Sequence, residues 1–365
     1  MIHFRVFENI NQDLIDNLNC IKKKTSHYIF QSPEWMYVAA SNLNNFDKLK
    51  IVFIYNHNDI ILVAPLYIRR IYGCKELCWL SSDIIDYNNI IISDFFNYED
   101  HNFKKLWKKI IKDLSNECDL VFFNKNPELI TYLNNPIIDA QYKYYQKSYQ
   151  LNLKGFDYES FYNNKNNNKS KQTDRRKKKK LHENSDLIYS YEDIDLTNFK
   201  LVEELIFEKM SSYHSNKKKS FDYKNIVDQY KKLVSYNNSN YKFNLSILKK
   251  NGVKISSILG VIFNGIYYYL IPVVNNTDYK KLSPGRFHII NLINWAIKNN
   301  IRSIDFTAGD EPYKNSWSNN EFKMFYYVHS LTLKGTVRCF FLNLYYNYRK
   351  NTFFKKIYHY IRYEI

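Results

Sequence analysis

The sequence predicts an α/β protein made of two similar units, each with a mixed, mostly antiparallel sheet flanked by helices. β-rich runs separated by turn residues occur in both halves of the chain, and an amphipathic helical pattern accompanies them in each half. The length agrees, because 365 residues exceed one typical hydrophobic core and suit two domains of ordinary size.

The first half contains a predicted hairpin and a predicted helix. The runs Lys50–Tyr55 and Ile60–Ile68 flank the polar cluster Asn56–Asp59, which is typical of a β-hairpin. The segment Phe103–Leu114 predicts a helix, because its apolar residues recur at spacings of three and four.

The second half repeats this pattern. Its predicted strands and helix are Phe243–Leu248, Val253–Phe263, Ile266–Val274 and Phe199–Met210. Asn251-Gly252 and Asn264-Gly265 separate the strands, and Asn-Gly favours tight hairpin turns because both residues tolerate positive φ.

A polar, strongly basic segment, Asn163–Asn184, lies between the halves. One interpretation is a solvated linker or exposed helix. The other is an anion-contacting helix in which Arg175, Arg176 and the adjacent lysines meet phosphates. Aromatic residues are not interleaved with the basic ones, so the base-stacking part of a single-strand nucleic-acid site is missing. A nucleotide-sugar, lipid phosphate or CoA phosphate fits as well as RNA.

The segment from Ser283 to Trp317 carries the most chemistry. Ser283 is a predicted N-cap, with Pro284 at the first helical position and Gly285 allowing close approach to the backbone. The helix that follows is expected to end near Asn299 and to bury Ile289, Leu292, Ile293, Ala296 and Ile297. Its N-terminus predicts an anion site supported by Lys280, Lys281 and Arg286. The alternative is that Ser-Pro-Gly only starts a helix.

A short strand, Ser303–Thr307, follows and completes a βαβ unit with an expected right-handed crossover. Asp310 is then expected to cap a short helix with Tyr313, Lys314 and Trp317 on one face. In the purely structural interpretation Asp310 is a cap, Trp317 is core and Lys314 is solvated. A functional role is favoured for Tyr313 and Lys314.

Composition narrows the partners. The net charge of +17 favours anionic partners, although Asn, Lys, Ile and Tyr are also the residues of an AT-rich genome. The N-terminus lacks the apolar core of a signal peptide and no run is long enough to span a membrane, so a cytoplasmic location is expected. The five scattered cysteines suit a reducing compartment, and no metal site is predicted.

The run LSPGRFHIINLINWAIKNNIRSIDFTAGDEPYKNSW resembles the C-terminal signature of the CelD/BcsL-type acetyltransferases, a branch of the GNAT superfamily associated with bacterial polysaccharide biosynthesis. FQSPEWM, the PL pair at Pro65, DYNNI and KSKQTDRRKKKKL also look like that family, so the resemblance covers roughly residues 30–334. It implies two tandem GNAT-like units, similar also to Fem-type aminoacyl transferases.

The resemblance further implies acetyl-CoA or another acyl-CoA as co-substrate, held where Ile266–Val274 and Ser303–Thr307 splay apart. The cofactor-binding residues carried over are Lys280, Ser283, Gly285 and Arg286. The loop KKLSPG departs from the usual GNAT pattern, because Lys280 and Ser283 stand at the first Arg/Gln and first Gly positions.

Acyl transfer needs a base, an oxyanion donor and an acid for the leaving thiolate. Tyr313 is the expected acid, Asp305 and Glu311 are the candidate bases with Asp305 preferred, and Lys314 is expected to bind an acceptor phosphate or carboxylate. The remaining substrate-side residues are Asp310, Trp317, Arg175 and Arg176.

The far C-terminus predicts a basic, aromatic amphipathic helical tail. One stripe is Val337, Phe340, Phe341, Leu344, Tyr345 and Tyr348, and a second is Phe354, Ile357, Tyr358 and Ile361. Such a helix packs on its own domain or lies in a membrane interface, where a lipid-linked acceptor would be found. The expected boundaries are 1–155 and 186–335 for the two units, 156–185 for the basic connection and 336–365 for the tail.

Three function classes follow. The leading one is an acyl-CoA-dependent N- or O-acyltransferase acting on a sugar, nucleotide-sugar or cell-envelope polysaccharide precursor, an anionic or glycan acceptor. The second is a Fem-like ligase that uses aminoacyl-tRNA, and the third is a non-catalytic binding protein with the same fold. Binding of acyl-CoA or of tRNA distinguishes them.

Overall fold

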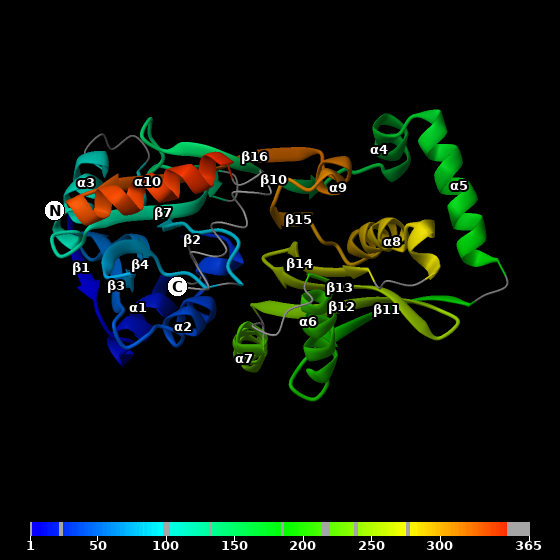
Figure 1. The fold of residues 1–365 in the computed structure, drawn as a ribbon, viewed down its shortest axis with the longest axis horizontal. Coiled ribbons are helices and arrows are strands. Elements are labelled where there is room, and N and C mark those ends of the chain that lie inside the picture. Colours follow the sequence, from blue (N-terminus) through cyan, green and yellow to red (C-terminus); the bar gives the residue numbers. More distant parts are fainter. Residues whose placement is uncertain are drawn as a thin grey trace. The chain divides into compact units, whose positions relative to one another are not determined.

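The chain forms two compact units in a computed structural model, which describes residues 2–21, 25–82, 84–97, 103–130, 133–183, 186–213, 220–236, 240–274 and 278–348 (Figure 1). Unit 1 contains the residues up to Lys147 together with the described residues from Phe322 onward, and unit 2 contains Ser148–Glu321. The chain therefore leaves unit 1, builds unit 2 and returns to unit 1. The boundary falls within strand β10 (Lys143–Asn152).

The main sheet of unit 1 has the strand order β1-β3-β4-β5-β7-β16. These strands are β1 (Ile2–Phe7), β3 (Lys48–Asn56), β4 (Asp59–Ile71), β5 (Cys74–Trp79), β7 (Leu120–Pro127) and β16 (Asn320–Ser330). The pairing of β5 with β7 is parallel, and the others are antiparallel. The predicted first hairpin is confirmed as β3 and β4. Short strands complete the unit: β2 (Thr25–Ser26), β6 (Ile91–Ser93), β8 (Leu129–Ile130) and β9 (Leu133–Asn134).

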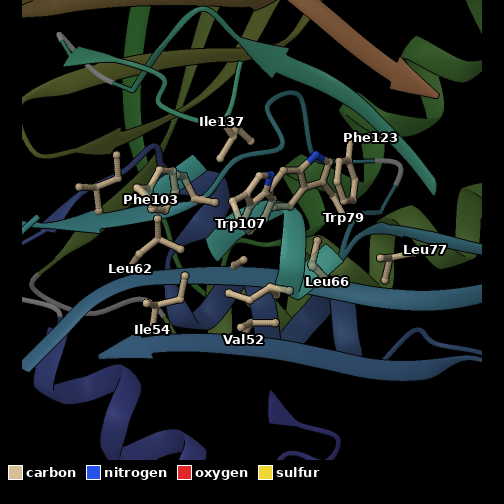
Figure 2. Packing of buried hydrophobic residues seen from close by; sticks show 14 of the residues in the cluster. Val52, Ile54, Leu62, Leu66, Leu77, Trp79, Phe103, Trp107, Phe123 and Ile137 are labelled. Carbon is tan, nitrogen blue, oxygen red and sulfur yellow. The ribbon is translucent and has the colours of Figure 1, made fainter. Parts of the chain in front are cut away.

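Helices cover the sheet of unit 1. They are α1 (Gln12–Ile21), the 3₁₀ helix η1 (Ile29–Gln31), α2 (Pro33–Ala40), α3 (Phe103–Leu114) and α10 (Leu333–Tyr348). Helix α3 has the predicted bounds, and its buried face inserts Phe103, Trp107 and Ile110. Trp107 stacks on Trp79 with ring centroids 6.3 Å apart, and Figure 2 shows both indoles beside Phe123. Burial of each large side chain of this kind contributes about 1.5–3 kcal/mol to folding.

A buried carboxylate attaches α10 to the sheet of unit 1. Glu76 on β5 is fully buried and accepts hydrogen bonds from Arg69 Nε at 2.8 Å and from Arg338 Nε at 2.7 Å. The two guanidinium groups lower the pKa of Glu76 against the effect of burial, which alone would raise it. The cation on α10 therefore gives this buried carboxylate a second charged partner beside Arg69.

Unit 2 has the strand order β10-β15-β14-β13-β12-β11, counting β10 from Ser148. The strands are β11 (Leu187–Ile194), β12 (Tyr241–Lys250), β13 (Val253–Phe263), β14 (Ile266–Val274) and β15 (Ser303–Ala308). All the predicted strands of this half are confirmed. Asn251 and Asn264 have φ of 49°, and Gly252 and Gly265 are also positive, as Asn-Gly turns require.

The helices of unit 2 are α4 (Tyr158–Lys165), α5 (Asn168–His182), α6 (Lys200–Tyr213), α7 (Ser220–Ser235), the 3₁₀ helix η3 (Asp278–Leu282), α8 (Pro284–Lys298) and α9 (Pro312–Ser316). The basic segment thus forms α5, with Asn167 as its N-cap. The core between α8 and the sheet contains Leu292, Ile293 and Ala296, each with no exposed surface. Ile297 was expected there but is 40% exposed, because the buried face of α8 is narrower than the apolar pattern.

Candidate functional site

Two neighbouring parallel strands of unit 2 separate partway along their length. Within the fully described strands β14 and β15, the parallel pairing runs from Ile266 with Ser303 to Tyr268 with Asp305. Beyond this point β14 continues to Val274, and its register with β13 shifts between Leu259 and Gly260. The parallel pairing therefore stops near this bulge, and we call the unpaired carboxyl ends of β14 and β15 beyond it the V.

The start of α8 lies against the end of β14. A Cβ built on Gly285 would come within 2.8 Å of Val274 Cγ2, so the close approach depends on the absence of a side chain. Pro284 occupies the first turn, as predicted. The first turn of the helix therefore stands next to the open end of the V.

Ser283 corrects one prediction. It has the N-cap position, but its φ of 57° and ψ of 53° are left-handed and its side chain makes no capping hydrogen bond. Its hydroxyl instead accepts a hydrogen bond from Lys177 Nζ of α5 at 2.8 Å. Lys280 and Lys281 are exposed on the preceding turn. The segments that meet at the start of α8 therefore carry three ammonium groups, those of Lys177, Lys280 and Lys281.

The side chain of Arg286 contacts other residues of unit 2. Its Nε donates to both oxygens of Asp174 at 2.8 and 3.0 Å, and its Nη2 donates to Asn166 Oδ1 at 2.8 Å. The guanidinium also stacks over the ring of Trp317, 4.8 Å from its centroid. Tyr162 donates a further hydrogen bond to Asp174 at 2.7 Å. Arg286 therefore joins α5, α8 and the residue after α9, and Trp317, 2% exposed, belongs to the core.

Asp305 lies at the bottom of the V. It is fully buried and its Oδ1 accepts a hydrogen bond from the backbone N–H of Thr307 at 2.7 Å. Thr307 has a φ of 58°, in the left-handed region that is costly for a β-branched residue. Ser148 Oγ donates to the Thr307 carbonyl at 2.8 Å, at a point where β10 and β15 change register. The carboxylate thus holds a strained strand end.

Helix α9 follows this strand end. Its N-cap is Glu311, not Asp310 as predicted, and Glu311 makes no side-chain capping bond. Lys314 is 5% exposed, donates to the Ala308 carbonyl at 2.8 Å and lies 3.1 Å from Glu311 Oε2. Gly309, with φ of 138°, leaves room for this pair, since a Cβ there would meet Glu311 Oε2 at 2.2 Å. The purely structural interpretation, in which Lys314 is solvated, does not match this buried position, while its expected binding of an acceptor phosphate or carboxylate stays a prediction.

Tyr313 stands near the point where the strands diverge. Its half-buried ring lies 6.4 Å from that of Tyr269, the first residue of β14 after the last parallel pair. Burial raises the pKa of Tyr269 well above its ordinary value. Both phenols are therefore adjacent to the V, and Tyr269 stays protonated at neutral pH.

Residues 168–315 match the family of acetyltransferase (GNAT) domains. This similarity covers most of unit 2. No curated protein matches the chain. The matched range begins with the basic helix α5.

Three solved structures share the fold over most of the chain. FemX has a TM-score of 0.53 at 9% identity, covering 90% of this chain and 97% of that one. L-PGS from Bacillus licheniformis has a TM-score of 0.51 at 8% identity, covering 93% and 97%. A tandem GNAT protein from the clavulanic acid biosynthesis pathway has a TM-score of 0.50 at 7% identity, covering 90% and 98%. At these identities the likeness shows the fold alone, a tandem GNAT-like architecture with mixed sheets and flanking helices.

Unit 2 brings most of the predicted site residues together, although several of them have other contacts than expected. Ser283, Gly285 and Arg286 meet at the start of α8, and Asp305, Glu311, Tyr313 and Lys314 surround the end of β15. Arg175 and Arg176 are exposed on α5.

Sequence reasoning missed Asp174 and Thr307. Asp174 had a signal, because it is the one acidic residue in the run KSKQTDRRKKKKL. Thr307 had none, since a left-handed backbone at threonine follows from the surrounding contacts rather than from its own preference.

Proposed function

We propose that this protein is an acyl-CoA-dependent N- or O-acyltransferase whose acceptor is a sugar, nucleotide-sugar or cell-envelope polysaccharide precursor. The observation that carries the proposal is the V between β14 and β15, with the start of α8 at its open end. The acceptor class is supported by the CelD/BcsL-like signature of the same segment. The GNAT family match supports the reaction type.

The residues present fit an acyl-CoA. Gly285 keeps the first turn of α8 close to β14, and the ammonium groups of Lys177, Lys280 and Lys281 offer charge for the phosphates. Arg286 is committed to Asp174, so its role is to hold α5 beside this loop. Acyl-CoA supplies an activated thioester.

The end of β15 supplies the acid–base groups. Tyr313 donates a proton to the leaving thiolate, because a phenol ordinarily has a higher pKa than a thiol, about 10 against about 8.5. Of the two carboxylates, Glu311 is 55% exposed and free to meet an acceptor, whereas Asp305 is fully buried under the strand end. Glu311 is therefore the proposed base, and Asp305 positions the strand. Lys314 holds Glu311 in place.

Hydrogen exchange with acetyl-CoA tests this function. Binding should slow exchange of the amides at the start of α8, and the double substitution Lys177→Gln with Lys280→Gln should weaken the protection. Lys298→Gln, at the far end of the same helix, is the matched control. Absence of binding by acetyl-CoA, succinyl-CoA and free CoA in calorimetry would overturn the proposal.

A second candidate is a Fem-like transferase that uses aminoacyl-tRNA. The fold of FemX and the exposed Arg175 and Arg176 on α5 favour it. It predicts tRNA binding that weakens steeply with salt, in proportion to the phosphates contacted, and aminoacyl transfer without CoA. Filter binding at 50 and 200 mM salt distinguishes it from the acyl-CoA reaction.

Membrane contact through α10 would bring a lipid-linked acceptor to the enzyme. One face of α10 exposes Leu333, Val337, Phe340, Phe341 and Tyr348, at 87%, 61%, 63%, 44% and 48%. The second predicted stripe lies outside the described residues. Among the described helices, none has the length and apolar character to cross a bilayer. We therefore expect the protein to co-sediment reversibly with vesicles that contain anionic lipid. The substitution Phe340→Asp should abolish this co-sedimentation.

A further inference from the structure

Unit 1 contains a cavity of about 300 Å³, the lower end of the range for small-molecule sites. Its lining residues lie in α3 with Ser115 directly after it, in β7, in the turn before β10, and in β16 with Leu331 directly after it. None of them falls in residues 168–315, the range that matches the GNAT family. This cavity therefore shares no residue with the V between β14 and β15.

The floor of the cavity is apolar and aromatic. Its residues are Trp107, Ile111, Val121, Phe123, Ile137 and Tyr327. Trp107, Phe123 and Ile137 are almost fully buried and belong to the core of unit 1, as Figure 2 shows. Apart from the indole N–H of Trp107 and the hydroxyl of Tyr327, the side chains of this floor have no polar atoms, so it favours a flat hydrocarbon ring over a polyhydroxylated ligand.

One wall is a pair of stacked tyrosines. The rings of Tyr142 and Tyr327 lie 5.2 Å apart with an angle of 26° between their planes. Burial raises the pKa of Tyr142 well above its ordinary value, so its hydroxyl stays a donor. The stacked pair is a preformed surface that loses little conformational freedom when a ring binds against it.

The rim is positively charged. Lys108 and Lys112 are exposed, line the cavity and lie one helical turn apart on α3. The imidazole of His329 also lines the cavity. The acidic lining residue is Asp139, and its Oδ1 already accepts the backbone N–H of Gln141 at 3.0 Å. The carboxylate keeps its charge, so the lining holds two ammonium groups against one carboxylate.

We propose that this cavity binds a small amphipathic anion, with a flat apolar ring on the aromatic floor and a carboxylate or phosphate at Lys108 and Lys112. The ring class follows from the floor, and the anionic group follows from the rim. The site gives unit 1 a ligand of its own, independent of the reaction proposed for unit 2.

Calorimetry with a small panel of probes tests the site. Indole-3-acetate and phenyl phosphate present the two kinds of anion, indole-3-acetamide removes the charge, and glucose 6-phosphate replaces the apolar ring with a polar one. We expect saturable binding of at least one aromatic anion and at least fivefold weaker binding of the amide and of the sugar phosphate. Equal affinity across the panel, or no saturable binding of either aromatic anion, would overturn the proposal.

Variants on one helix locate the charge. The double substitution Lys108→Gln with Lys112→Gln should weaken binding of the aromatic anion at least fivefold and leave the affinity for the amide unchanged. Lys104→Gln with Lys105→Gln is the control, because both residues are exposed on α3 and do not line the cavity. All these side chains are exposed, so folding is expected to survive, and melting curves check it. Equal losses in both pairs would contradict the site.

A fluorine signal locates the ring. With 5-fluorotryptophan in all five tryptophans, the Trp107 resonance, assigned from Trp107→Phe, should shift on binding. Trp295 and Trp317 lie in unit 2 and report on binding elsewhere. A shift at Trp295 or Trp317 without one at Trp107 would place the probe outside the cavity and refute the proposal.

Discussion

At the scale of single residues, the end of β15 shows how a carboxylate supports an unfavourable backbone. A non-glycine residue held in a sparsely populated conformation costs on the order of 1–3 kcal/mol. Thr307 is held there by hydrogen bonds from its N–H to Asp305 and from Ser148 to its carbonyl. The strained residue lies directly before the loop that leads to α9, so the geometry of Tyr313 depends on it.

Two substitutions at Asp305 separate positioning from proton transfer. Asp305→Ala should destabilise unit 2 by about 2 kcal/mol, because it removes a buried acceptor from Thr307. Asp305→Asn keeps an oxygen acceptor but cannot act as a base. Retained stability and kcat in Asp305→Asn, measured by urea denaturation and initial rates, would support positioning. A large loss of kcat at unchanged stability would instead make Asp305 the base.

Tyr313→Phe tests the proposed acid. The change removes one hydroxyl from a half-buried ring, so we expect little change in melting temperature and in KM. The turnover should fall by about 100-fold or more, the typical contribution of a general acid. Steady-state kinetics with acetyl-CoA measure both constants, and an unchanged kcat would rule out this role.

His288 predicts a pH dependence of stability. It is fully buried, its Nδ1 lies 2.9 Å from Ser256 Oγ, and burial lowers its pKa from 6.5 to about 3. The unfolded chain binds a proton below pH 6.5 while the native protein does not, so this stability is present above pH 6.5. It is lost as the pH falls towards 3, by about 1.4 kcal/mol per pH unit.

The check is urea denaturation of the parent protein and of His288→Gln between pH 7 and pH 4. The variant should lose stability less steeply, since glutamine does not titrate. Parallel pH curves would show that His288 is protonated in the native state.

At the scale of elements, one ion pair unites three helices around the proposed phosphate loop. Arg286 on α8 binds Asp174 on α5 and stacks on Trp317, directly after α9. Both charged side chains are mostly buried, at 24% and 12% exposure. Hydrogen bonds between charged groups in such surroundings are stronger than neutral ones.

Asp174→Asn should release α5 from α8. We expect a loss of about 2 kcal/mol in the free energy of unfolding of unit 2 and weaker acyl-CoA binding, because Lys177 is carried by the same helix. Asp186→Asn, an exposed acidic residue after α5, is the control. Urea denaturation and calorimetry measure both effects. Unchanged acyl-CoA affinity would show that α5 does not contribute to the phosphate site.

The elements with strong local patterns were predictable. The bounds of α3, β13 and β14 follow from apolar periodicity and from Asn-Gly turns, which are properties of neighbouring residues. The roles of single polar residues were not. Arg286 was predicted to bind phosphate, which stays a prediction. The structure also pairs it with Asp174, a residue distant in sequence whose helix α5 packs on η3.

The caps show the same limit. Ser283 and Asp310 are both residue types that favour an N-cap. Ser283 stands at the observed N-cap position of α8, and Asp310 stands one residue before the observed N-cap of α9. The structure nevertheless makes Ser283 left-handed and moves the cap to Glu311. Side-chain preferences for caps are worth about 1 kcal/mol, so contacts such as the one between Ser283 and Lys177 override them.

At the scale of the whole molecule, two units with separate cores should unfold in separable steps. Acetyl-CoA at about 100 times its Kd should stabilise unit 2 by about 2.7 kcal/mol and leave the transition of unit 1 in place. Scanning calorimetry with hydrogen exchange assigns each transition to its unit. A single transition that shifts as a whole would show that the units are energetically inseparable.

The return of the chain to unit 1 has a consequence for synthesis on the ribosome. Strand β16 pairs with β7, and Arg338 of α10 is bound to Glu76, yet both segments are translated after all of unit 2. Until they emerge, β7 lacks β16, one of its two neighbouring strands, and Glu76 lacks the guanidinium of Arg338. Unit 2, whose residues are contiguous, is therefore the first that can be completed, although unit 1 begins first. A chain that ended at Glu321 would contain all of unit 2 and an unfinished unit 1 exposed to chaperones and proteases.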